Sequence, residues 1–172
     1  GLGIPAVRDR IVEAAVKLII EPILEADFRD CSYGFRPKRG AQDAISEVQA
    51  QITWGYRKVI EADLQACFAS LPHTGVLAAV ARRIRDPWIL RLLRRWLKAG
   101  ILEEGMIRTA VAGTPEGGVL SPVLANAYMH AFDEAWETKM RGTRLIRYCD
   151  DYVTLSRRNP QPRLGRIEGL IA

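Results

Sequence analysis

Apolar residues near the N-terminus recur at intervals of three and four, the spacing of one face of a helix. They predict an amphipathic helix over residues 7–23, with Pro22 near its end: Val7, Ile11, Val12, Ala15, Ile19 and Ile23. A second set with the same spacing predicts another helix: Ala44, Ile45, Val48 and Ile52. Between them, the stretch CSYGFRPKRG predicts an ordered turn that presents positive charge, with an ordinary solvated loop as the alternative.

The middle of the chain predicts one strand followed by two helices. Three apolar residues indicate a short strand that ends close to Asp63: Val59, Ile60 and Leu64. A helix is expected over about residues 74–85, and the next begins at Pro87 and closes at Gly100, the usual placement of Pro and Gly. The Gly-rich residues 100–122 predict a turn-rich region or a small hairpin.

The last third of the chain predicts a long helix and then a hairpin. Ser121 suits the N-cap of the helix and Pro122 its first position. One continuous apolar face is expected on it: Leu124, Ala127, Tyr128, Ala131, Phe132, Ala135 and Trp136. Two alternating runs, residues 145–149 and 152–155, predict the hairpin, so the fold class is α+β.

Composition narrows the class of protein. With 172 residues and 48% hydrophobic content, one compact unit with a sizeable core is expected. A formal charge of +5 makes an acidic macromolecular partner plausible without demonstrating one. No apolar run approaches the ~18 residues of a membrane span and no signal peptide is evident, so a soluble intracellular protein is expected.

The cysteines and the chain ends each carry a further expectation. Cys31, Cys67 and Cys149 fit neither a disulfide framework nor a zinc spacing, and small buried thiols in a reducing compartment are predicted. The chain opens without a Met and stops within a helical pattern, so it is interpreted as a piece of a longer protein.

The hairpin tip carries the candidate chemistry, because Asp150 and Asp151 stand side by side there. Clustered carboxylates raise one another's pKa unless a cation neutralises them, and Mg²⁺ prefers such oxygen ligands. Asp63, at the end of another predicted strand, is the candidate third carboxylate. The alternative is an ordinary turn, in which Asp side chains accept hydrogen bonds from nearby backbone amides.

Four stretches in order resemble the reverse transcriptases encoded by bacterial group II introns. They are LGIPAVRDRIVEAAVKLIIEPILEADFRDCSYGFRPKRG, ADLQACF, GTPEGGVLSPVLANAYMH and RYCDDYVTLSR, and together they extend over about residues 1–158. The resemblance implies a right-hand polymerase whose small antiparallel palm sheet, with its Asp-bearing hairpin, packs on helices. It assigns residues 1–56 to part of the fingers and 57–172 to part of the palm, with a helical insertion at 73–100. The thumb and maturase regions are expected outside this chain.

The same resemblance implies roles for particular residues. The catalytic residues, which would bind two Mg²⁺ ions that Mn²⁺ can replace, are Asp63, Asp150 and Asp151. The implied nucleotide-binding residues are Leu64, Phe68, Pro115, Glu116 and Gly117. The implied template or RNA-binding residues are Arg8, Arg10, Phe35 and Arg36. Without the resemblance, Phe68 fits a core position, and the Arg residues fit ordinary surface charge.

The implied activity is RNA-directed DNA synthesis, in which deoxynucleotides are added to a DNA primer on an RNA template. A splicing role with intron RNA, the bacterial cytoplasm and no membrane association follow from the same family. The chain has Glu116 where the family usually has Gln, and Ala69 and Pro72 where it favours Asp. These departures keep open a degenerate RNA-binding maturase, and a reverse transcriptase of a defence, CRISPR or diversity-generating system is a further alternative. This piece alone is expected to be weakly active or inactive.

Overall fold

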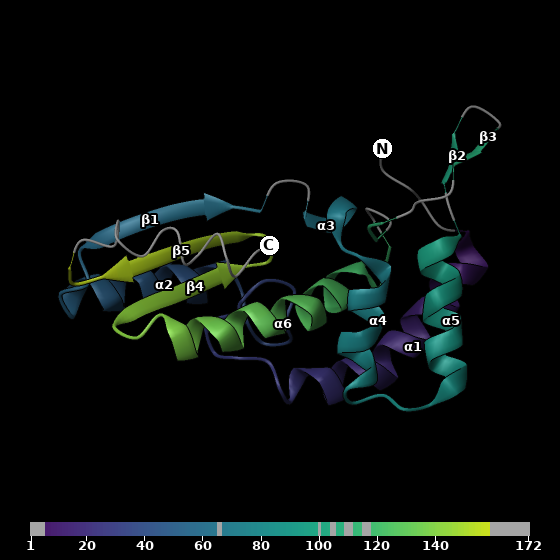
Figure 1. Cartoon of the computed structure of the whole chain (residues 1–172), viewed down its shortest axis with the longest axis horizontal. Helices are drawn as coiled ribbons and strands as arrows, with labels where there is room; N and C mark the ends of the chain where they lie inside the picture. The colour runs from purple at the N-terminus through teal and green to yellow at the C-terminus, as the bar shows by residue number, and fades with distance from the viewer. Residues whose placement is uncertain are drawn as a thin grey trace. The chain divides into compact units, whose positions relative to one another are not determined.

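The computed structural model describes residues 6–64, 67–99, 101–103, 106–108, 112–114 and 118–158. Its elements, labelled in Figure 1, are α1 (Val7–Glu25), α2 (Ala41–Thr53), β1 (Lys58–Asp63), α3 (Cys67–Ser70), α4 (His73–Ala81), α5 (Pro87–Lys98), β2 (Ile101–Glu103), β3 (Met106–Arg108), α6 (Ser121–Lys139), β4 (Thr143–Tyr148) and β5 (Asp151–Ser156). The predicted helices, the strand ending at Asp63, the small hairpin and the final hairpin are confirmed. Helix α4 ends earlier than predicted, α3 was not predicted, and Gly100 lies outside the described residues.

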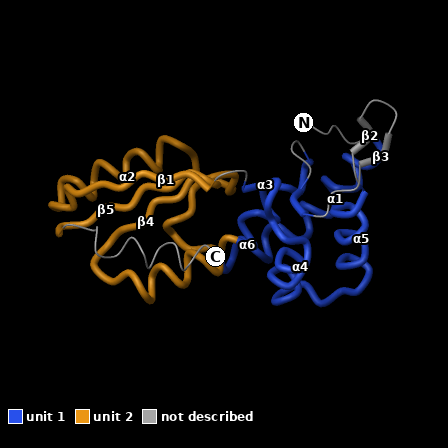
Figure 2. The backbone as a smooth tube through the Cα atoms, turned by 45° about the horizontal axis from the view of Figure 1, so that its top comes forward, with its two compact units in different colours: residues 1–27, 66–128 blue, residues 28–65, 129–172 orange. Residues whose placement is uncertain are grey.

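The chain divides into two compact units, each made of two separate stretches (Figure 2). Unit 1 comprises residues 1–27 and 66–128, and unit 2 comprises residues 28–65 and 129–172, so the boundary falls within α6. The expectation of one compact unit is therefore wrong. Each unit buries its own set of apolar side chains, which length and composition alone do not reveal. The assignment of residues 1–56 to fingers and 57–172 to palm stays a prediction.

Unit 2 is built on a three-stranded antiparallel sheet with the strand order β1-β5-β4. On one face, α2 packs over β4 and β5, where Ala44, Ile146 and Leu155 are buried together. On the other face, the ring of Tyr152 lies 5.8 Å from that of Phe132 and 6.3 Å from that of Trp136, both on α6. The α+β class with a small antiparallel sheet packed on helices is thereby confirmed.

Unit 1 contains α1, α3, α4, α5 and the β2–β3 hairpin. Helices α4 and α5 pack against each other, with Val76, Val80 and Leu93 fully buried. Helix α5 begins as predicted: Pro87 is its first residue and Asp86 is its N-cap. The carboxylate of Asp86 accepts hydrogen bonds from the amides of Trp88 and Ile89, at 2.7 and 3.2 Å. None of the helices in the described residues is long and apolar enough to cross a membrane.

Helix α1 is confirmed, but it does not bury the face that predicted it. The apolar residues of the predicted face are solvent-exposed or nearly so: Val7, Ile11, Val12, Ala15, Ile19 and Ile23. The buried residues are Glu13, Val16, Ile20 and Leu24. Apolar residues occupy two neighbouring arcs of this helix, and the spacing of three and four fits both arcs.

Helix α6 also departs from the single apolar face. Ser121 is the first helical residue rather than the N-cap, so Pro122 is the second. Ala131 is exposed, whereas four polar residues of α6 are buried: Ser121, Asn126, His130 and Asp133. Polar groups buried on a central helix need partners, and the partner of Asp133 is part of the site described next.

Candidate active site

A two-residue turn joins β4 to β5 and carries the adjacent carboxylates. Tyr148 and Asp151 are the closing cross-strand pair, which leaves Cys149 and Asp150 as the turn residues. Cys149 has φ +61°, and Asp150 does not have a positive φ, the pattern of a type II′ turn. The backbone twist of this turn type matches that of the flanking strands. Asp150 lies in the turn, and Asp151 is the first residue of β5.

The third predicted carboxylate lies beside the other two. Asp63, the last residue of β1, is the cross-strand partner of Asp151. One residue further, the amide of Leu64 donates to the backbone carbonyl of Asp150 at 3.2 Å. Opposed residues of an antiparallel pair project from the same face with Cβ atoms about 5 Å apart. Pairing of β1 with β5 therefore brings together three residues that are up to 88 positions apart in the sequence.

The three carboxylates influence one another. Desolvation raises the pKa of Asp151, and the negative charges of Asp150, Asp63 and Glu61 raise it further. Asp63 and Asp151 are exposed and Asp150 is half-buried, so a solvated cation can reach them. Oxygen-only donors of this charge fit a divalent ion such as Mg²⁺. Within the described part of the chain, no three His, Cys, Asp or Glu side chains already stand close enough together to hold a metal.

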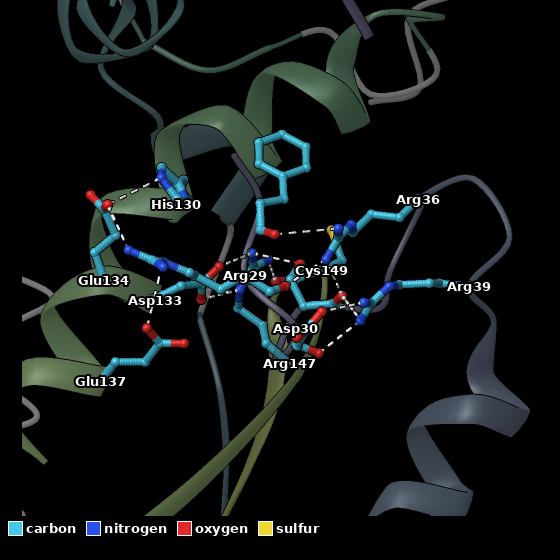
Figure 3. Close-up of polar contacts among 12 residues, drawn as sticks. Arg29, Asp30, Arg36, Arg39, His130, Asp133, Glu134, Glu137, Arg147 and Cys149 are labelled. Carbon is cyan, nitrogen blue, oxygen red and sulfur yellow. Dashed lines mark hydrogen bonds and ion pairs between the residues drawn. The ribbon is translucent and has the colours of Figure 1, made fainter. Parts of the chain in front are cut away.

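Behind the turn, Arg147 makes a buried ion pair with Asp133 of α6 (Figure 3). Its Nε and Nη2 donate to the two carboxylate oxygens of Asp133 at 2.9 and 2.7 Å, and both side chains are only 1% exposed. The same guanidinium donates to the hydroxyl of Ser32 and to the backbone carbonyl of Cys149. Burial alone would lower the pKa of Arg147, but the hydrogen bonds and charge of Asp133 hold it above its ordinary value.

The predicted RNA-binding residues fall in two kinds of environment. Arg8 and Arg10 are exposed on α1, and Phe35 is 52% exposed. Arg36 is buried: its Nη1 donates to the carbonyls of Arg29 and Ser32 at 2.6 and 2.8 Å. Its charge therefore holds backbone carbonyls inside unit 2, and a contact of Arg36 with RNA stays a prediction.

The predicted nucleotide-binding residues are described in part. Leu64 is half-buried directly after β1, whereas Pro115, Glu116 and Gly117 lie outside the described residues. Phe68 is half-buried on α3, and its carbonyl accepts the amide of Thr114 at 2.7 Å. This hydrogen bond connects α3 with Thr114, the residue directly before the predicted nucleotide-binding residues Pro115, Glu116 and Gly117.

A close approach of Gly113 to α3 reinforces that connection. Gly113 has φ +94°, and a Cβ there would lie 2.6 Å from the carbonyl oxygen of Ala69. The amide of Gly113 donates to Leu71 at 2.8 Å, and Nε2 of His73 donates to the carbonyl of Gly113 at 2.7 Å. Both the left-handed backbone and the contact require glycine at this position.

Two charged features of structural importance were not predicted from the sequence: the pair of Arg147 with Asp133, and Glu13. Arg147 lies two residues after Leu145 on β4, on the same α6-facing side of the sheet, and Asp133 lies within the apolar stretch of α6. A charge at an inward position of an alternating strand is the signal that could have identified the pair. Glu13 is the second such feature: its Oε2 accepts the amide of Val119, just before α6, at 3.0 Å.

Replacing Glu13 with Gln is expected to change how stability depends on pH. Desolvation raises the pKa of Glu13 and the Asp9 charge raises it further, whereas the Val119 hydrogen bond lowers it. A carboxyl whose folded pKa is raised stabilises the fold most at low pH and loses that contribution as pH rises through the folded pKa. Glu13→Gln keeps an acceptor without the charge, so its melting temperature relative to the parent should rise as pH increases from about 4 through the folded pKa of Glu13 and then level off. A difference that shrinks over that range contradicts this.

All three cysteines are free thiols. Cys67 and Cys149 are buried as predicted, and Cys31 is half-buried. Burial, together with the nearby charge of Asp133, raises the pKa of Cys31 to about 12. The thiol is therefore protonated near neutral pH and unreactive as a nucleophile.

The sequence has clear relatives. Residues 1–168 match the family described as reverse transcriptase (RNA-dependent DNA polymerase). Protein YkfC of Escherichia coli (strain K12) is 45% identical over 137 residues, covering 77% of this chain and 36% of YkfC. Group II intron-encoded protein LtrA of Lactococcus lactis subsp. cremoris is 38% identical over 133 residues, covering 77% of this chain and 22% of LtrA. The chain thus spans well under half the length of these relatives.

A solved structure supports the fold. The partial Cas6-RT-Cas1–Cas2 complex contains a chain that superposes with a TM-score of 0.52 at 29% sequence identity, covering 98% of this chain and 30% of that one. The family match extends over almost the whole chain. The chain belongs to the reverse transcriptase (RNA-dependent DNA polymerase) family, and its predicted resemblance to the group II intron-encoded members is confirmed.

Proposed function

We propose that the longer protein containing this chain is an RNA-directed DNA polymerase of the group II intron type. The observation that carries this proposal is the pairing of β1 with β5, which sets Asp63 opposite Asp151 and beside Asp150. A protein that only binds RNA has no physical need for three neighbouring carboxylates, because RNA is itself an anion.

Asp63, Asp150 and Asp151 are the proposed ligands of two Mg²⁺ ions, which Mn²⁺ can replace. When bound, such ions activate the 3′-hydroxyl of the DNA primer and stabilise the charge of the leaving pyrophosphate. This chain's own residues set the position of the carboxylates. The β1–β5 register fixes Asp63 against Asp151, and the type II′ turn holds Asp150 at the tip.

The remaining site residues complete the proposal. Phe68 is the proposed contact with the sugar of the incoming deoxynucleotide, where a ring excludes a 2′-hydroxyl. Leu64, Pro115, Glu116 and Gly117 are the other proposed nucleotide contacts, and Arg8, Arg10, Phe35 and Arg36 the proposed RNA contacts. Palm and fingers are proposed for residues 57–172 and 1–56. The bacterial cytoplasm is the proposed location, supported by the Escherichia coli and Lactococcus relatives.

Primer extension by the full-length protein tests the proposal. The assay supplies an RNA template, a DNA primer, deoxynucleotides and Mg²⁺, with a metal-chelated reaction beside it. Extension that requires metal and deoxynucleotides is expected. RNA binding without extension would instead favour the degenerate RNA-binding maturase, which the departures at Glu116 and Ala69 keep open. Residues 1–172 alone are expected to extend the primer weakly or not at all.

RNA binding should weaken steeply with salt. A polymerase must accept any template, so it grips RNA through phosphates and 2′-hydroxyls rather than through base identity. Each phosphate contact releases counterions, and we expect affinity to fall at least about tenfold between about 50 and 200 mM salt. Fluorescence anisotropy of a labelled RNA with the full-length protein measures this. Affinity that stays constant over that range would contradict a phosphate-tracking surface.

A further inference from the structure

Residues 31–36, called here the supporting segment, lie directly against the end of β4. The amide of Arg147 donates to the carbonyl of Cys31 at 2.7 Å, and the amide of Tyr33 donates to the carbonyl of Arg147 at 2.8 Å. Between these bonds, Ser32 forms a parallel bridge with Arg147. The supporting segment therefore continues the sheet beyond β4, one residue pair before the turn that bears Asp150.

Gly34 touches the backbone of the turn itself. A Cβ at this position would lie 2.4 Å from the amide nitrogen of Cys149 and 2.9 Å from the carbonyl carbon of Tyr148. Both are main-chain atoms, so they cannot move aside as a flexible side chain could. The space at Gly34 admits no side chain while the turn keeps its position.

The guanidinium of Arg147 also contacts the backbone of the turn (Figure 3). It donates to the carbonyl of Cys149 at 2.8 Å, and that carbonyl belongs to the peptide bond leading into Asp150. The donor is fixed in turn by Asp133 and by the hydroxyl of Ser32, at 2.9 Å. A bidentate Arg–carboxylate pair has little rotational freedom, so the Arg147 nitrogen that donates to the carbonyl of Cys149 is held in position by Asp133.

Arg36 makes the supporting segment rigid. Besides its hydrogen bonds to the carbonyls of Arg29 and Ser32, its guanidinium stacks 5.5 Å from the ring of Phe28. Arg36 is 8% exposed, so these partners replace water around its charge. Arg36 thereby has a role inside unit 2 that the sequence pattern does not indicate.

We propose that the supporting segment and the Asp133–Arg147 pair together fix the Cys149–Asp150 peptide, which makes Ser32, Gly34, Asp133 and Arg147 positioning residues for Asp150. This inference rests on the proposed polymerase function for its catalytic consequence. Its structural part, the immobilisation of the turn, is independent of that function. A carboxylate displaced by a fraction of an ångström loses productive geometry, whereas substrate binding elsewhere is unaffected.

Two variants of the full-length protein test the proposal. Ser32→Ala removes one partner of the Arg147 guanidinium, and Gly34→Ala pushes a methyl group against the turn. Arg29→Gln is the matched control, because Arg29 pairs with Glu134 and Glu137 of α6 from the same loop without touching the turn. Four quantities are measured for each: kcat and KM for deoxynucleotides, the melting temperature, and the hydrogen-exchange rate of the Leu64 amide, which donates to the backbone carbonyl of Asp150.

Ser32→Ala and Gly34→Ala are expected to lower kcat about ten- to a hundredfold, the usual effect of losing a residue that orients a ligand, with KM nearly unchanged. Exchange of the Leu64 amide should accelerate in both, while Arg29→Gln leaves kcat and that exchange as in the parent. Equal kcat and equal Leu64 exchange in all four proteins would overturn the proposal. If the parent itself extends no primer, the polymerase function fails, and Leu64 exchange alone decides whether the turn is positioned as inferred.

Discussion

Replacing Asp150 with Asn should abolish measurable primer extension by the full-length protein. The proposed ions stabilise the charge that develops during phosphoryl transfer, a contribution of several kcal/mol. Since each 1.36 kcal/mol corresponds to a factor of ten in rate, a loss of at least about a thousandfold is expected. Asn keeps the size and one oxygen of the side chain and removes its charge. Single-turnover extension on an RNA template measures the effect.

Glu61→Gln is the matched control for Asp150→Asn. Glu61 is an exposed carboxylate on β1, two residues before Asp63, and its charge is also felt by Asp151. Its replacement removes the same charge from the same neighbourhood but takes away no proposed ligand, so extension should remain within about tenfold of the parent. RNA affinity should match the parent in both variants. Comparable losses of extension in both variants would show that local charge, rather than ligation by Asp150, is what matters.

The carboxylate arrangement could be predicted from the sequence because it depends on local patterns. Alternating residues predict strands β4 and β5 and place Asp150 and Asp151 at the tip. In the structure the turn lies one residue earlier, at Cys149 and Asp150, and Asp151 begins β5. The pairing of β1 with β5 is not local. Asp63 is a candidate from the sequence because it ends another predicted strand, and the family resemblance then implies its role beside the hairpin. The backbone of the structure pairs Asp63 with Asp151 and joins Leu64 to Asp150, whereas the role of the three carboxylates as metal ligands remains a proposal.

The faces of the helices could not be predicted as well as their existence. Spacing of three and four identifies a helix, but α1 carries apolar residues on two arcs, and tertiary packing selects the arc of Val16, Ile20 and Leu24. The arc left exposed includes Leu18, at 76% exposure. Burying the other arc also brings Glu13 to the amide of Val119, a contact between residues 106 positions apart. The spacing of apolar residues within α1 cannot predict a contact with a residue so far along the chain.

The conformation of the supporting segment could not be predicted from its composition. Its Arg, Phe and Gly residues suit an RNA-binding loop equally well, because composition does not reveal where a guanidinium points. Phe35 and Lys38 adopt left-handed φ values of +54° and +59°, which sequence preferences disfavour for such residues. The surrounding hydrogen bonds of Arg36 and Arg39 to backbone carbonyls stabilise this conformation. These bonds span four to nine residues, and the hydrogen bonds that join Arg147 to Cys31, Ser32 and Tyr33 add the long-range contacts that fix the segment's position.

Replacing Asp133 with Ala is expected to lower the free energy of unfolding by about 3–5 kcal/mol, the usual effect of leaving one partner of a buried ion pair unpaired. Asp133 and Arg147 are each 1% exposed, so water cannot replace the lost carboxylate. Ser32 and the carbonyl of Cys149 still accept from Arg147, but neither carries a compensating charge. Urea denaturation followed by circular dichroism measures the change.

Two further variants separate the buried charge from the general loss of a side chain. Glu134→Gln, at the next position of α6, breaks a half-exposed pair with Arg29 and should reduce stability by no more than about 1 kcal/mol. The double variant Asp133→Leu with Arg147→Met removes both charges, and it should recover part of the stability that Asp133→Ala loses. Recovery would remain incomplete because Ser32 and the Cys149 carbonyl lose their donor. If Asp133→Ala costs no more than Glu134→Gln, the buried pair does not stabilise the fold as its geometry indicates.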